Sequence, residues 1–232
     1  MHLSARRSLQ LGLLFILCVL PAGAHAIPTI ACHCFTDRSF DPAQPAKADP
    51  YFLATTQNSF FAAAFGIDKK TVVMQKQKGT SGDELWIAYW LGTRTGTSPD
   101  ALQKERAAQG SWQKAVTRLA IPVKAQGVQV AAVLKKNAPD ERVSKAVVDD
   151  LLLAYRFHGE ADLTALRKAG ATNQEVILAG LLSARMRRPA LELFREVKGG
   201  RASWGALLQR ARIEPGAIQS EIVQLINASA AK

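Results

Sequence analysis

Two apolar runs with matching polar lead-ins lie 91 positions apart in the chain: residues 79–91 (GTSGDELWIAYWL) and 170–182 (GATNQEVILAGLL). In each, a Ser or Thr two residues after the glycine and a glutamate three residues further on match a capping box, which starts a helix. The opening glycine suits the left-handed turn that closes a preceding helix. Because each run is apolar on nearly all sides, both helices are predicted to be buried.

The likeness between the two segments continues downstream. Residues 111–121 match residues 203–213 at an offset of 92, and each begins with a Ser-Trp pair. Ser111 and Ser203 are favourable N-cap residues. Trp112 and Trp204 then occupy equivalent places near a helix start, and we interpret them as core anchors because large aromatic side chains bury much apolar area. A ligand-stacking pair is the alternative interpretation.

The periodicity of the whole chain is helical, and no segment shows the apolar alternation of a strand. We predict an all-α fold with two homologous copies of a five- to six-helix unit packed together. The first copy spans residues 50–137 and the second 138–232, preceded by an irregular arm over 27–49. A shared interface is expected, because a repeat that cannot bury its own apolar face gains by stacking on its neighbour.

The first 26 residues have the pattern of an export signal. Arg6 and Arg7 precede a leucine-rich stretch over 9–20, and a small-x-small site ends at Ala26. About a dozen apolar residues are too few to span a bilayer, which needs about 20. We therefore predict cleavage near Ala26, a periplasmic or secreted protein, and no transmembrane span in the mature chain.

The arm carries the sole cysteines of the expected mature chain, in the motif Cys32-His33-Cys34. Three interpretations stay open: a disulfide, within the motif or to another chain; a metal site; or a free redox pair. A metal site would need a further ligand such as His158, and the two thiolates would favour a soft ion. Export into an oxidising compartment favours the disulfide.

A polar belt, residues 55–59, interrupts the aromatic and alanine-rich helix expected after Pro50. Such a belt can line a pocket. We favour the interpretation in which this turn faces solvent or packs through hydrogen bonds.

No catalytic or cofactor-binding pattern is found in the sequence. Glu84 and Glu175 are the most fixed carboxylates, and their capping role explains them. There is no Gly-x-Ser-x-Gly nucleophile turn, and Gly199-Gly200 lies between two expected helices and not after a strand. The sequence therefore favours a protein that is not an enzyme and has no cofactor.

Charge gives the clearest functional indication. The chain has 30 Lys and Arg against 19 Asp and Glu, a net charge of +11. Basic residues crowd one stretch of the second copy and form the predicted polyanion-binding site: Arg185, Arg187, Arg188, Arg195, Lys198 and Arg201. A basic face of this kind attracts polyanions, although the same charges also suit solvated helix faces and helix C-termini.

Paired helix–turn–helix patterns over 69–91 and 163–182 would suit DNA binding on a basic chain. The export signal argues against a regulator of transcription. An anionic envelope polymer, lipid headgroups or a protein partner fit the predicted compartment better.

The order of a short apolar helix at Glu175, a proline-led helix at Pro189, a Gly at 199 and the Ser203-Trp204 helix resembles a helical module of uncharacterised exported bacterial helical-repeat proteins. The resemblance implies a helical fold and export and brings no activity. We predict an exported, non-enzymatic binding or interaction protein of the cell envelope or exterior that contacts anionic surfaces. The alternative is a redox or metal-handling factor that uses Cys32, His33 and Cys34.

Overall fold

The computed structural model describes residues 40–230, which form thirteen α-helices and one 3₁₀ helix, with no strand in this range. The all-α prediction is therefore confirmed for the described part of the chain. The helices in order are α1 (Asp49–Phe65), α2 (Lys69–Gln77), α3 (Gly82–Thr95), α4 (Pro99–Gln109), α5 (Trp112–Arg118), α6 (Val123–Gln126), α7 (Val128–Leu134), α8 (Asp140–Ala154), α9 (Glu160–Lys168), α10 (Asn173–Met186), α11 (Ala190–Lys198), α12 (Trp204–Arg210), η1 (Pro215–Ala217) and α13 (Ile218–Ala230).

The two predicted capping boxes lie at the starts of α3 and α10. At α10, Thr172 Oγ1 accepts from the Glu175 N–H at 3.3 Å, and Glu175 Oε2 accepts from the Thr172 N–H at 2.9 Å. At α3, Ser81 Oγ accepts from the Glu84 N–H at 3.1 Å, which is the first of the two bonds. The capping box is therefore complete at α10, whereas at α3 the bond to the N-cap Ser81 is the one observed.

We expect Thr172→Ala to lower the free energy of unfolding by about 1 kcal/mol, because the N3 amide of α10 loses its acceptor. Urea unfolding of the mature chain measures this as a lower midpoint at constant slope. Thr172→Ser keeps the hydroxyl and is expected to cost much less. Equal losses in the two variants would contradict a capping role.

Two central helices form the core of the molecule. Residues 85–92 of α3 and 175–182 of α10 are buried on all sides, as their apolar runs predict. Trp112 and Trp204, the predicted core anchors, are 1% and 2% exposed. Trp86 of α3 also contacts an aromatic cluster from α1, with its ring centroid 4.5 Å from that of Phe61.

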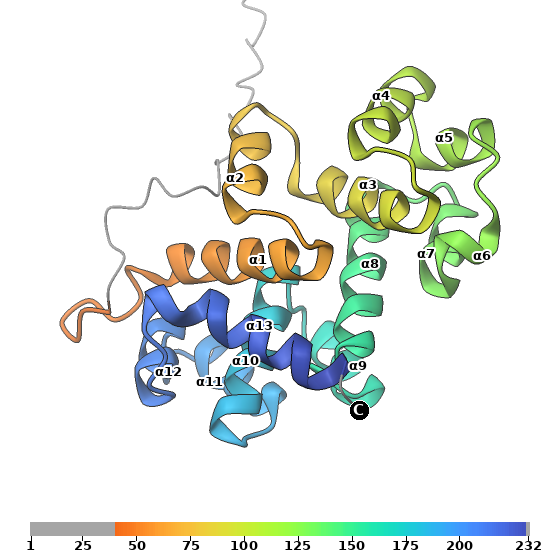
Figure 1. Ribbon diagram of the computed structural model, residues 1–232. Helices are drawn as coiled ribbons and strands as arrows, with labels where there is room; N and C mark the ends of the chain where they lie inside the picture. The colour runs from red at the N-terminus through yellow and green to blue at the C-terminus, as the bar shows by residue number, and fades with distance from the viewer. Residues whose placement is uncertain (1–39, 231–232) are drawn as a thin grey trace, which may run out of the picture.

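The first helix of each half of the chain packs against the other half. The helix α1 lies against α10, α12 and α13, whereas α8 lies against α3 and α7 (Figure 1). Asp49 at the start of α1 adds a specific link, since its carboxylate accepts from the N–H groups of Trp204 (3.0 Å) and Gly205 (2.8 Å). Each half thus contributes its first helix to the packing of the other half.

Only the first half contains more α-helices than the predicted five or six. Residues 50–137 hold seven α-helices, counting α1 from Asp49, and the described residues after 137 hold six α-helices and η1. The extra element of the first half is α6, in the link between α5 and α7. Pro122 precedes its first residue, and Gly127 ends it with φ +86°, a left-handed value that glycine adopts readily.

No helix within residues 40–230 combines the length and apolar character needed to cross a membrane.

Candidate functional site

The cysteine motif Cys32-His33-Cys34 lies outside the residues that the structure describes, so its state stays a prediction. Within residues 40–230, no three His, Cys, Asp or Glu side chains group as a metal site. His158, the further ligand considered, is buried, and its Nε2 lies 2.8 Å from the Val176 carbonyl oxygen. Burial lowers the pKa of His158. A Cβ at Gly180 would lie 2.9 Å from this nitrogen, so His158 packs tightly against α10.

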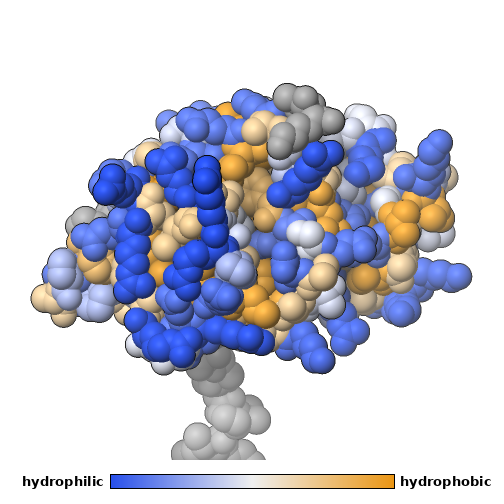
Figure 2. Space-filling model, turned by 90° about the horizontal axis from the view of Figure 1, so that it is seen from below, coloured by the Kyte–Doolittle hydropathy of each residue, from blue (hydrophilic) through white to orange (hydrophobic). Residues whose placement is uncertain are grey.

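The predicted polyanion-binding residues share one region of the structure, which we call the basic surface. It runs from the end of α10 through α11 to the turn before α12, and all of its members except the half-buried Arg188 are exposed. Figure 2 shows strongly hydrophilic side chains gathered on the side of the molecule where these helices lie. The basic surface consists of Arg185, Arg187, Arg188, Arg195, Lys198 and Arg201.

Ion pairs occupy part of the basic surface. Arg188 Nη2 lies 2.5 Å from Glu196 Oε1, and Lys198 Nζ lies 2.7 Å from Glu175 Oε1. The hydrogen bond from Arg188 also lowers the pKa of Glu196, which keeps that carboxylate ionised. These pairs fix the two basic side chains in place and reduce the charge that they offer to a ligand.

Four arginines of the basic surface make no ion pair within the described part of the chain, and three of them, Arg187, Arg195 and Arg201, also make no side-chain hydrogen bond there. Arg187 is the left-handed C-cap of α10, with φ +53°, which turns the chain and places the next helix beside it. The Arg185 Nε–H donates to the Ala211 carbonyl at 3.4 Å. The uncompensated positive charge is therefore concentrated on α11 and its flanking turns.

The polar belt of α1 is buried and does not face solvent, so that part of the sequence interpretation is wrong. Residues 55–59 are at most 9% exposed, because α2, α3, α10, α12 and α13 all pack against α1. Asn58 Oδ1 accepts from Lys76 Nζ at 2.6 Å, whereas Thr56 Oγ1 and Ser59 Oγ have no hydrogen-bond partner among the described groups. Burial lowers the pKa of Lys76 to about 8.

A groove of about 920 Å³, which no sequence pattern predicted, lies between α3, α5, α6, α7 and α8. Trp90, Arg94, Val123, Val128 and Asp150 are among the residues that line it. These residues span more than 60 positions and form no short motif, which is why no spacing rule finds the groove. The available signal was a pair of valines in an otherwise polar link, Val123 directly after Pro122 and Val128 directly after Gly127.

No known protein family matches the chain, and the comparisons with curated proteins and with solved structures found no similar protein. The resemblance to exported bacterial helical-repeat proteins stays a prediction.

Proposed function

We propose that this chain is an exported, non-enzymatic binding protein of the cell envelope or exterior, which contacts anionic polymers or lipid headgroups through the basic surface. The observation that carries the proposal is that Arg187, Arg195 and Arg201 are all exposed and lie on α11 or within three residues of its ends. Like charges held together by a folded scaffold create a local positive potential that attracts polyanions. The export pattern of residues 1–26 supports the compartment.

We further propose that the two halves of the chain are copies of one helical unit. The equivalent helices α2 and α9 both have nine residues, α3 and α10 both have 14, and α5 and α12 both have seven. Left-handed backbone also recurs at equivalent places, at Gly79 and Gly170 and at Ala120 and Arg212. Together with the packing of α1 and α8 against the opposite halves, this supports a fused pair of helical units that shares one core.

A role in regulating transcription is not part of the proposal. Within the second helix–turn–helix pattern, residues 175–182 of α10 are all buried. That stretch of the helix therefore has no free face to lay into a DNA groove, which a recognition helix requires.

Heparin tests the proposal as a model polyanion. We expect the mature chain to bind it with an affinity that falls as salt rises, because bound polyanions release counterions. A triple variant with Arg187→Glu, Arg195→Glu and Arg201→Glu is expected to lose at least about tenfold in affinity at about 0.15 M salt. Vesicles with and without phosphatidylglycerol then distinguish lipid headgroups from a soluble polymer.

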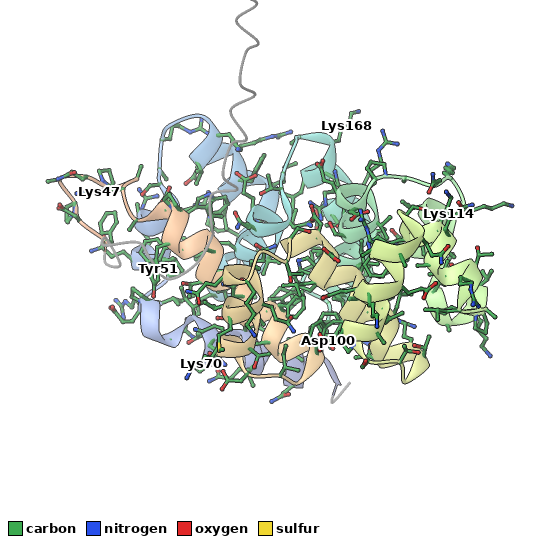
Figure 3. The ribbon with its side chains drawn as sticks, turned by 90° about the horizontal axis from the view of Figure 1, so that it is seen from above. Lys47, Tyr51, Lys70, Asp100, Lys114 and Lys168 are labelled. Atoms are coloured by element: carbon green, nitrogen blue, oxygen red, sulfur yellow. The ribbon has the colours of Figure 1, made fainter. Side chains whose placement is uncertain are left out.

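The matched control reverses three exposed basic residues of the first half: Lys104, Lys114 and Arg118. Figure 3 places Lys114 at the end of the molecule formed by α4 to α7. This variant has the same net charge as the test variant and is expected to keep most of its affinity. Equal losses in both variants would show that net charge alone matters and would overturn the localised surface.

A further inference from the structure

The groove between α3 and α5–α8 has the size and the walls of a small-molecule site. Its volume of about 920 Å³ lies within the range of about 300–1,000 Å³ that is typical of ligand pockets. Val116 and Leu134 line its inner side and are 6% and 2% exposed, so the floor is apolar. It lies in the half of the molecule away from α11 and is separate from the basic surface.

Hydrogen bonds and close packing hold one wall of the groove in place. The Trp90 Nε1–H donates to the Gln126 carbonyl at 2.7 Å, and the Gln126 amide donates to the Ile121 carbonyl at 2.9 Å. Both side chains are buried. A Cβ at Gly127 would lie 2.9 Å from the Trp90 ring and 3.2 Å from Asp150 Oδ2, so only glycine fits there. The wall is formed before any ligand arrives.

The mouth of the groove exposes apolar side chains to water. Val128 is 88% exposed and Val123 is 70% exposed, the two largest values among the exposed large hydrophobic residues of the described chain. Both belong to the groove lining. A ligand with an apolar body would cover them and remove that area from water.

The charged groups of the groove favour an anion. Three cations line it, Arg94, Lys124 and Lys135, against one carboxylate, Asp150. The Arg94 guanidinium carbon lies 3.6 Å from the centre of a Trp90 ring, which places a planar donor group over the apolar wall. Arginine in such a position binds a carboxylate through two parallel hydrogen bonds. Burial raises the pKa of Asp150 to about 6 and the nearby Arg94 acts to lower it, so Asp150 is mostly ionised at neutral pH and offsets one of the three positive charges.

We propose that this groove binds an amphiphilic carboxylate, with the apolar body along Val116, Val128 and Leu134 and the carboxylate at Arg94. Apolar walls with a few converging polar groups are the usual composition of such sites. The proposal does not depend on the basic surface and goes beyond the contact with anionic polymers.

A fluorescent dansyl-labelled undecanoate, titrated into the full mature chain, tests this site. We expect saturable binding that dodecanoate displaces at least about tenfold more effectively than dodecanol, because the alcohol lacks the charge. Failure of the probe to bind the wild-type chain would overturn the proposal. Equal displacement by acid and alcohol would overturn the carboxylate assignment.

Two variants test whether the probe binds in the groove. Ala131→Trp fills the groove and Arg94→Gln removes its proposed anchor while leaving the fold intact, and each is expected to weaken binding at least about tenfold. The control is Arg185→Gln, which removes an exposed arginine of the basic surface. Unchanged binding in Arg94→Gln, or a loss in Arg185→Gln as large as in Arg94→Gln, would overturn the proposal. Loss of heparin binding in Arg94→Gln is not expected, so the two proposals fail separately.

Discussion

Replacing Arg167 with methionine is expected to lower the free energy of unfolding by about 2–3 kcal/mol, because a half-buried carboxylate loses a charged hydrogen-bond partner. The Arg167 side chain is 9% exposed and that of Asp149 is 16% exposed. Arg167 Nε and Nη2 donate to Asp149 Oδ1 at 2.9 and 2.5 Å, and the guanidinium also bonds to Asn173 Oδ1 and the Ala171 carbonyl. One side chain thus holds α8, α9 and the start of α10 together.

Arg106→Met is the matched control, because it breaks an ion pair that is more exposed to solvent than the pair of Arg167. Arg106 Nη2 pairs with Asp140 Oδ2 at 2.9 Å, but the two side chains are 32% and 26% exposed. Water solvates the carboxylate once this arginine is gone, and a loss of about 1 kcal/mol or less is expected. Adding Asp149→Asn to Arg167→Met should recover stability, because it removes the stranded charge. Urea unfolding at neutral pH measures all four chains, and similar losses in Arg167→Met and Arg106→Met would contradict the argument.

The helices themselves could be predicted because their signals are local. Ser203 caps α12 through a bond from the Ala206 N–H at 3.1 Å, as Thr172 caps α10. Trp112 and Trp204 directly follow the N-caps Ser111 and Ser203, and both are buried, as predicted. Hydrophobic periodicity and capping act over a few residues, so the sequence shows them directly.

Contacts between distant parts of the chain could not be predicted from the sequence. The link from Asp49 to the start of α12 joins groups about 155 positions apart, and nothing near Asp49 indicates its partner. The polar belt of residues 55–59 has the composition of a solvated turn. It is buried because several helices from both halves pack around α1, which local composition does not encode.

The candidate sites differ in the same way. The basic surface was visible in the sequence because its residues lie close together along the chain, from Arg185 to Arg201. The groove was not visible, because Trp90, Val128 and Asp150 meet only after five helices have packed. A surface built from neighbouring residues can be predicted from charge alone, whereas a concave site requires tertiary structure.

In the proposed repeat, the counterpart of Arg167 is Lys76, 91 residues earlier, and its chemistry is different. Each lies near the end of the second helix of its half and bonds to the first helix, at Asp149 and Asn58 respectively. Asn58 is neutral and 1% exposed, so Lys76 has no carboxylate in direct contact. Asp83 attracts the ammonium, but burial is the larger effect and lowers the pKa of Lys76 to about 8. The first half therefore holds a poorly compensated cation where the second holds a paired one.

We expect the wild-type chain to gain about 2 kcal/mol of unfolding free energy from Lys76 between pH 8 and pH 10. The unfolded chain keeps this lysine protonated up to its ordinary pKa of 10.5, whereas the folded chain releases the proton near pH 8. Between these values the unfolded state binds more protons, so stability rises with pH. Below pH 8 both states are protonated, and the folded state bears the full cost of the buried ammonium.

Urea unfolding of the wild-type and Lys76→Met chains at pH 7, 8, 9 and 10 measures this gain as the difference between two profiles. The subtraction matters because burial also lowers the pKa of Lys69 and raises those of Tyr89 and Tyr155, which titrate in or near the same range in both chains. Lys76→Arg stays charged throughout and should also lack the rise. Parallel profiles for wild type and Lys76→Met would show that Lys76 is solvated in the folded state, since a solvated ammonium has the same pKa folded and unfolded.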